Sequence, residues 1–369
     1  MGNAITPAST MSLVILDLFW SSEINSALVN TRAWAVQERF LAPRVLHFGR
    51  RQLIWECREK DAAEMYPKGL PPNLSRLPDA RFKSFDQTIL MEQTGGFNFP
   101  KIPMKLGICC GSGLLRRNYM RCGLTFPNDK LIACSGMAKM MKQILNDEYV
   151  AGMWRKYLEA ELLWAVLSSG TSSRPAEYRA PSWSWASVDG DIHPQRRWVR
   201  NPPIIVKDIH LDYKTDDVTG EISGGWLRVL GVLKRTKLTR KTWITRRRDV
   251  RYWHMSLEGI DVTDLGLEDS PDPKIHVSLD VDQEDFEQES SQDLLFSMCA
   301  KPPSENKTIM YLLLFKLVSR EKATFRRIGI AHAFDETVKN HILSIERGVE
   351  EPQLPCIEYR DGLHSIYVI

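Results

Sequence analysis

The chain has 369 residues, which is long enough for two domains or for one large domain with a sizeable core. Its hydrophobic content of 43% and charged content of 26% are those of an ordinary globular protein. A net charge of +3 is small for this length, so the composition argues against a dominant polyanionic partner.

Cysteine usage and hydropathy argue against secretion and against membrane insertion. The seven cysteines are odd in number, include no Cys-x-x-Cys pair and follow no secretory leader, which favours reduced thiols in a cytoplasmic or nuclear protein. The apolar run Met11–Trp20 contains Asp17 and is much shorter than the about 20 residues of a membrane-spanning helix. We therefore expect no membrane partner.

The stretch 31–57, TRAWAVQERFLAPRVLHFGRRQLIWEC, predicts a short helix, a proline break and two strands. Asn30 or Thr31 is expected to cap the helix, because either side chain can accept a hydrogen bond from a free backbone N–H, and Pro43 is expected to end it. Strands are expected on either side of a turn at Gly49. The inward helical face is expected to carry Ala33, Trp34, Gln37, Phe40 and Leu41.

Residues 61–128 read as a loop-rich connecting region, and residues 129–170 read as an αα-hairpin. Asn128 or Asp129 is expected to cap the first helix. A second helix is expected after Asn146, running to Val166. The first helix shows apolar residues at the spacing of one face, namely Met137, Met140, Met141, Ile144 and Leu145.

The remainder, 171–369, reads as a β-rich antiparallel domain. Its first part, APSWSWASVDG at 180–190, alternates strictly and predicts a strand with Trp183 and Trp185 on one face and a turn at Asp189. Short apolar or alternating runs predict further strands at 204–206, 226–232, 275–279, 311–318, 325–330 and 366–369.

Two blocks of charge lie between these strands. Lys234–Arg251 holds nine basic residues and one Asp, and Asp280–Asp293 holds seven acidic residues. A nuclear import signal, an RNA-binding ridge or an acidic interaction segment would fit such blocks. Two solvated loops or hairpins are the simpler interpretation, and we prefer it because charge runs have many structural uses.

The stretch 31–57 closely resembles the closing segment of the fungal heterokaryon incompatibility (HET) domain, which typically reads T-R-A-W-x-x-Q-E-R-x-L-x-P-R-x-L-x-F followed by a W-E-C strand. Two later blocks, at 127–164 and 181–187 (PSWSWAS), resemble segments of HET proteins in the expected order. The residues that carry the resemblance are Thr31, Arg32, Trp34, Gln37, Glu38, Arg39, Pro43, Arg44, Trp55, Glu56, Cys57, Trp183 and Trp185.

The resemblance implies that residues 1–60 are the C-terminal part of an α/β HET domain, which is distantly similar to TIR domains. The whole chain would then be α+β. A full HET domain carries upstream motifs like Y-x-A-L-S-Y-x-W-G and D-x-x-C-I-N-Q, which this sequence does not contain. We therefore expect a HET domain that is truncated on its N-terminal side.

The resemblance also implies a role in fungal nonself recognition, where contact between incompatible partners triggers cell death through protein–protein interaction. An inactive remnant or an adaptor is an alternative, because the domain is expected to be incomplete. The implied partners are other proteins of the incompatibility response, without a specific nucleic acid or membrane. The implied location is cytoplasmic, with Lys234–Arg251 as the feature that would serve nuclear import.

Motifs for catalysis and metal binding are not found. No G-x-S-x-G, H-E-x-x-H or zinc-finger spacing occurs, so we predict no metal site and no cofactor. Some TIR domains cleave NAD with a glutamate on a helix, and by that analogy Glu38 is a weak catalytic candidate. An ion pair of Glu38 with Arg39 or Arg32 is the interpretation we prefer. We expect no enzymatic activity, with a TIR-like NAD-cleaving hydrolase as the alternative.

Overall fold

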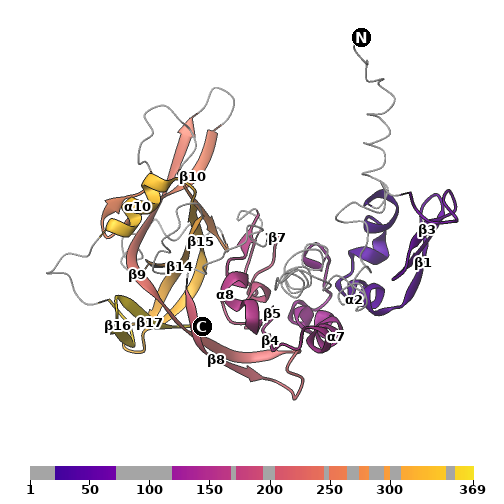
Figure 1. The fold of residues 1–369 in the computed structure, drawn as a ribbon, viewed down its shortest axis with the longest axis horizontal. Coiled ribbons are helices and arrows are strands. Elements are labelled where there is room, and N and C mark those ends of the chain that lie inside the picture. Colours follow the sequence, from indigo (N-terminus) through magenta and orange to yellow (C-terminus); the bar gives the residue numbers. More distant parts are fainter. Residues whose placement is uncertain are drawn as a thin grey trace, which may run out of the picture. The chain divides into compact units, whose positions relative to one another are not determined.

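The computed structural model describes residues 21–71, 119–167, 172–193, 204–244, 249–263, 274–281, 295–299, 309–345 and 354–369. The chain divides into two compact units, 1–148 and 149–369 (Figure 1). Helices and strands occur in both units, and one large sheet dominates the second. The α+β class expected from the sequence is confirmed.

The N-terminal unit contains a short helix followed by a small antiparallel sheet. Helix α2 (Ala33–Leu41) ends ahead of Pro43. Strands β1 (Arg44–Phe48), β2 (Leu53–Cys57) and β3 (Asp61–Ala63) then pair in the order β1-β2-β3. The predicted helix, proline break and two strands are confirmed.

The start and the buried face of α2 differ from the prediction. A 3-10 turn, η2 (Leu28–Thr31), leads into the helix, so the Thr31 hydroxyl donates to the carbonyl of Leu28 at 2.7 Å and does not cap α2. Trp34 is only partly buried. The predicted burial of Ala33 and Phe40 is confirmed, but Gln37 and Leu41 are only partly buried, and the helix buries Ala35 and Val36 in addition.

Helix α7 (Ser135–Leu145) confirms the first helix of the predicted hairpin. It begins later than expected, because two 3-10 turns, η4 (Pro127–Lys130) and η5 (Ile132–Cys134), occupy the predicted first turn. The helix ends at Asn146, whose φ of 45° is the left-handed conformation that commonly terminates helices.

The second predicted helix is wrong. Strands β4 (Tyr149–Val150) and β5 (Met153–Trp154) form a tight hairpin there, followed by the turn η6 (Arg155–Tyr157), the short helix α8 (Leu158–Glu161) and strand β6 (Ala165–Val166). The turn residues Ala151 and Gly152 have φ values of 47° and 93°, which a right-handed helix cannot contain. A two-residue turn of this kind therefore overrides the apolar spacing.

The predicted strand at 180–190 is also wrong. Pro181–Ser184 turns and leads into the 3-10 helix η8 (Trp185–Ser187). The Ser184 hydroxyl accepts a hydrogen bond from the backbone N–H of Ala186, a local bond that competes with an extended conformation. Trp183 and Trp185 are both buried, and so are Ser182, Ser184 and Ala186, so the segment has no alternation of a buried and an exposed face. Strand β7 (Ile192–His193) follows and pairs with β6.

The second unit is built on a sheet that includes all six strand runs expected from the sequence. Among the residues described, ten strands join this sheet. Its pairs are antiparallel except that β15 and β17 run parallel, which corrects the purely antiparallel expectation. The strands are β8 (Ile205–Tyr213), β9 (Ile222–Ile244), β10 (Asp249–Leu257), β11 (Ile260–Asp261), β12 (Ile275–Leu279), β13 (Leu295–Cys299), β14 (Met310–Ser319), β15 (Thr324–Ala333), β16 (Glu358–Arg360) and β17 (Leu363–Val368).

Strand β9 organises this sheet because it pairs along its whole length with several partners (Figure 1). Its first part lies between β8 and β17, and its later part pairs with β13 and β10. Apolar side chains of the sheet and of helix α10 (Glu336–Ser344) form one buried cluster. Asp335 caps α10 by accepting a hydrogen bond from the N–H of Val338 at 3.1 Å.

The described parts of the basic block belong to the sheet, and residues 245–248 lie outside the described residues. Lys234–Ile244 lies in β9, and residues 249–251 lie in β10, which pairs with β9. Lys234 is buried, and its ammonium group donates to the carbonyl of Ile345. Much of the acidic block, 282–293, lies outside the described residues. Its first residue, Asp280, is buried in an ion-pair cluster.

Candidate functional sites

A buried carboxylate joins the two strings that resemble the HET motif. Arg39 on α2 binds Glu56 on β2 through two bonds, Nε to Oε2 at 2.8 Å and Nη2 to Oε1 at 3.0 Å. His47 on β1 reaches the same carboxylate, with Nε2 2.9 Å from Oε2. Glu56 is fully buried, and the side chains of Arg39 and His47 are each only 10% exposed. The helix and both strands are therefore held by one charged group.

The charge state of Glu56 follows from these partners. Burial alone would raise its pKa, but hydrogen bonds from His47 and Arg39, together with their charges, lower the pKa to about 2. The carboxylate is consequently ionised at neutral pH. A buried charge of this kind is stable only while its partners remain in place.

Gln37 connects α2 to α7 within the N-terminal unit. Its side-chain oxygen accepts a hydrogen bond from the backbone N–H of Gly136 at 2.6 Å, in the first turn of α7. A Cβ atom on Gly136 would come within 2.9 Å of both Gln37 and Leu41. A larger residue at this position would therefore have to displace the ends of the Gln37 and Leu41 side chains.

Glu38, the weak catalytic candidate, does not belong to this cluster. It is exposed, and neither Arg39 nor Arg32 makes an ion pair with it. The preferred sequence interpretation, an ion pair of Glu38 with one of these arginines, is wrong, because Arg39 binds Glu56 instead.

The other motif residues of this unit lie around the cluster without joining it. Arg32, Pro43 and Arg44 are exposed, and Trp34 and Trp55 are partly buried. Next to the start of α2, the backbone N–H of Gly123 donates a hydrogen bond to the carbonyl of Thr31 at 2.8 Å. The thiol of Cys57 donates to the carbonyl of Lys60 at 3.1 Å.

The hairpin next to Glu56 exposes apolar side chains. On β1, Phe48 is 81% exposed and Leu46 is 47% exposed. Phe48 pairs with Leu53 on β2, and Leu46 pairs with Trp55, so these residues share one face of the sheet. Strand β1 is at the edge of this sheet. An apolar face beside an edge strand is a common feature of protein-binding surfaces.

In the C-terminal unit, the tryptophan block anchors neighbouring backbone. The indole N–H of Trp185 donates to the carbonyl of Gly152 at 2.7 Å, and the hydroxyl of Ser184 donates to Ala151 at 2.6 Å. The main-chain carbonyl of Trp183 accepts from the Trp164 indole at 2.9 Å. Trp183 and Trp185 therefore hold the β4–β5 turn and the segment around Trp164 in place.

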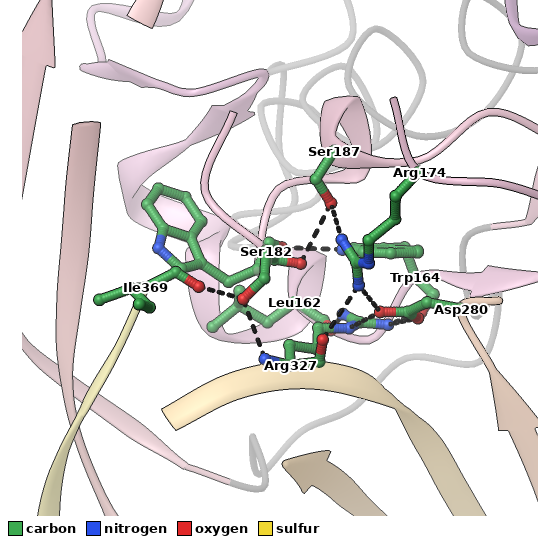
Figure 2. Close-up of polar contacts among 9 residues, drawn as sticks. Leu162, Trp164, Arg174, Ser182, Ser187, Asp280, Arg327 and Ile369 are labelled. Carbon is green, nitrogen blue, oxygen red and sulfur yellow. Dashed lines mark hydrogen bonds and ion pairs between the residues drawn. The ribbon is translucent and has the colours of Figure 1, made fainter. Parts of the chain in front are cut away.

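Arg327 on β15 is the centre of a buried polar network in this unit (Figure 2). It binds both oxygens of Asp280, at 3.1 and 3.2 Å, and donates to the carbonyls of Leu162 and Trp164. Its guanidinium carbon lies 3.5 Å from the ring centre of Trp164, a cation–π contact. The backbone N–H of Arg327 donates to the Ser182 hydroxyl at 2.9 Å.

A second guanidinium shares the same carboxylate. Arg174 binds Asp280 at 3.1 Å, the Ser187 hydroxyl at 2.7 Å and the carbonyl of Arg327 at 3.0 Å (Figure 2). Burial lowers the pKa of Arg174 to about 10; the charge of Asp280 opposes this decrease, and those of Arg326 and Arg327 add to it. Two buried cations thus share one buried anion.

Sequence reasoning missed both charged clusters. The sequence marks Arg39 and Glu56 only as separate motif residues, and it places Asp280 in a solvated acidic block. Asp280 and Arg327 are 47 residues apart, and Arg174 and Asp280 are 106 apart. Local patterns carry no information on such pairs. The sequence does show a charged residue within or directly after an apolar strand in each cluster, Glu56 in β2 and Asp280 after β12, but this signal does not identify the partner of either residue.

Neither a membrane span nor a metal cluster is found in the described part of the chain. No helix there is long and apolar enough to cross a membrane. In those same residues, no three His, Cys, Asp or Glu side chains are grouped so that they could hold a metal ion.

Comparison with known proteins gives no relative for this chain. No protein-family model, no curated protein and no solved structure matches it.

Proposed function

We propose that the chain is a HET-family protein that acts in fungal nonself recognition by binding another protein of the incompatibility response. In this proposal residues 1–60 belong to a HET (TIR-like) domain, and the protein acts in the cytoplasm. The motif residues then have an architectural role, and partner binding belongs to the surface that they support.

The observation that carries the proposal is the Arg39–Glu56 ion pair. The two strings of the resemblance, Q-E-R and W-E-C, contribute one partner each, at 2.8 and 3.0 Å. The first string also contributes Gln37, which binds Gly136 at 2.6 Å. A physical dependence between the strings explains why they would occur together, and so supports the family assignment.

The exposed apolar face of β1 and β2 supports protein binding as the mode of action. Phe48, Leu46 and Leu53 lie next to each other on the hairpin that Glu56 holds to α2. Aromatic side chains at the centre of an apolar patch commonly dominate the energy of protein–protein contacts. The chemistry of this face fits an apolar surface on a partner protein.

Inducible expression of the chain in a filamentous fungus tests the proposal. We expect growth arrest and cell death in the wild type. Phe48→Ser is expected to relieve the arrest at unchanged protein level, since it removes the largest exposed apolar side chain of the face. Growth would be measured as colony extension, and protein level by immunoblot.

Phe126→Ser is the matched control. Phe126 is 67% exposed in the same unit and lies outside the β1–β2 hairpin, so this variant is expected to remain toxic. Equal growth of hosts with and without the wild-type protein would contradict the proposal. Equal relief by both variants would contradict the assignment of the surface.

The geometry gives the alternative NAD-cleaving function no specific support. Glu38 is exposed and makes no ion pair with any residue described, so its carboxylate is not held in a defined orientation. Catalytic groups are usually fixed by neighbouring side chains. We therefore retain protein binding as the proposed function.

A further inference from the structure

A hollow of about 350 Å³ lies in the C-terminal unit, beside the Arg327 network. The segment 174–180 forms one wall, and side chains of β14 and β15 form another. Its volume is within the range of small-molecule sites in proteins. No residue of this hollow belongs to the HET-like strings of the N-terminal unit, so ligand binding here is independent of the proposed function.

Basic side chains outnumber acidic ones in the lining of the hollow. Arg174, Arg179 and Arg326 line it together with one acidic side chain, Glu177, and the last residue of the chain, Ile369, lines it as well. Arg179 is neutralised by Asp189, with Nη2 2.8 Å from Oδ1. The charge of Arg174 is only partly neutralised, because its partner Asp280 also binds Arg327.

Arg326 adds a further cation at the opening. Its side chain is exposed, and it makes no ion pair with any residue that the structure describes. In the strand register, Arg326 lies opposite Lys316 of β14. Lys316 is also basic, so this cross-strand neighbour does not neutralise the charge of Arg326. Buried and half-buried charges that exceed their counter-ions favour the binding of an anion.

Hydrogen-bond donors remain for such an anion. Arg174 uses Nη1 and Nη2 for its protein contacts, and its Nε–H has no partner among the described residues. The phenol of Tyr178 also lines the hollow, and burial, with a smaller effect of Asp212, raises its pKa to about 12. The phenol therefore remains protonated and able to donate at neutral pH.

We propose that this hollow binds the phosphoryl group of a small phosphomonoester, with Arg174, Arg326 and Tyr178 as donors. These donors come from the 174–180 segment and from β15, so they approach an anion from more than one direction. A tetrahedral phosphoryl group offers three acceptor oxygens out of one plane, whereas a carboxylate offers two oxygens in one plane.

The remaining lining favours an apolar or aromatic body on the ligand. Pro175, Val318 and Tyr178 contribute apolar surface to the same hollow, and both Val318 and Tyr178 are exposed. A planar ring could pack against them while its phosphate contacts the arginines. Free phosphate would gain the charged contacts only, so an aryl phosphate is expected to bind more tightly.

Titration calorimetry of the full chain with phenyl phosphate, inorganic phosphate and benzoate tests the proposal. Phenyl phosphate is expected to bind best, inorganic phosphate more weakly, and benzoate weakest. Arg326→Ala should weaken phenyl phosphate binding roughly tenfold or more, and Tyr178→Phe by roughly threefold to tenfold, as for hydrogen bonds to a charged group.

The control is Arg360→Ala, which removes the same charge from β16, where Arg360 lies beside Asp361 and outside this hollow. It is expected to leave binding unchanged within twofold. Arg326 is exposed, so its variant should fold, and the circular dichroism melt of each variant checks this. Benzoate binding as tightly as phenyl phosphate, equal losses in Arg326→Ala and Arg360→Ala, or no heat from phenyl phosphate at millimolar concentration would each overturn the proposal.

Discussion

Glu56 combines full burial with two basic partners, and this determines how the N-terminal unit responds to acid. Arg39 and His47 approach its carboxylate from the helix and from the neighbouring strand. Removing one partner from such a cluster leaves the other charges desolvated without compensation, which costs more than the net value of the intact pair. The strings that resemble the HET motif are thus sensitive to single substitutions at this position.

Acid is expected to weaken the unit through this residue. The pKa of Glu56 is about 2 in the folded protein against an ordinary value of 4.5, so its stabilisation is complete above pH 4.5 and is lost as the pH falls toward 2. The shift corresponds to about 3 kcal/mol. Glu56→Gln should therefore lower the unfolding free energy by about 3 kcal/mol at pH 7, and this difference should shrink below pH 4.5.

Urea unfolding followed by tryptophan fluorescence between pH 7 and pH 2.5 measures the effect. Glu38→Gln is the control, because Glu38 is an exposed carboxylate on the same helix whose substitution should change the free energy by less than about 0.5 kcal/mol. A Glu56→Gln difference that stayed constant with pH would show that Glu56 does not supply this stabilisation.

At the scale of elements, three hairpin turns share one backbone geometry, with Asp361–Gly362 between β16 and β17 as the third, and two of them differ clearly in their surroundings. Ala151–Gly152 joins β4 to β5, and Glu258–Gly259 joins β10 to β11, each with positive φ at both residues. This is the pattern of a type I′ turn. A Cβ on Gly152 would lie 2.5 Å from Nε1 of Trp185, whereas one on Gly259 would meet nothing within 4 Å.

Alanine substitutions at Gly152 and Gly259 distinguish the free-energy cost of backbone strain from that of a steric collision. Gly259→Ala should cost about 1 kcal/mol, because only the positive φ is penalised. Gly152→Ala should cost about 2–4 kcal/mol, because the added methyl group also displaces Trp185. Chemical denaturation of the two variants measures both values. Equal losses would mean that Trp185 yields without cost, and that the tryptophan block does not hold this turn.

The elements that could be predicted from the sequence are those whose local pattern agrees with their place in the fold. Strands β12, β14 and β15 were predictable because their apolar runs agree with the sheet that buries them, whereas only the first residues of β8, Ile205 and Val206, fell within a predicted run. The helix expected after Asn146 failed, because Gly152 forces a reversal that apolar spacing cannot register. The strand expected at 180–190 failed because the Ser184 hydroxyl binds the backbone locally.

At the scale of the whole molecule, the C-terminal unit contains its own core and its own ion-pair network. The apolar cluster of its sheet and α10 lies entirely within 149–369, and so do Arg327, Asp280 and Arg174. Among the described residues, the members of both structures all come from 149–369. These are the properties of a segment that folds independently.

A fragment of residues 149–369 is therefore expected to fold alone. It should be monodisperse, should melt in one cooperative transition, and should bind phenyl phosphate within about twofold of the full chain. Size-exclusion chromatography, calorimetric melting and titration calorimetry measure these properties. An aggregated or non-cooperative fragment would show that the unit needs residues from 1–148.

The candidate sites could be predicted only in part. The sequence identified residues of the N-terminal cluster, since Gln37, Arg39 and Glu56 all belong to the motif strings. It did not identify the ion pair of Arg39 with Glu56, because Glu38, the sequence neighbour of Arg39, was the expected partner. The hollow beside Arg174 had no sequence signal. Its residues come from a loop and from two strands more than a hundred positions later, and only the folded sheet brings them together.

The position of Arg327 has a consequence for synthesis. Its guanidinium donates to the carbonyls of Trp164 and Leu162, which lie 163 and 165 residues earlier in the chain. Its own strand, β15, comes after two of the three strands with which it pairs, β12 and β14. Contacts of such long range close late and slow the folding of β-rich domains. On the ribosome, Trp164 must wait for most of the polypeptide to emerge before the guanidinium of Arg327 can stack on it, and in that interval its indole is available to chaperones.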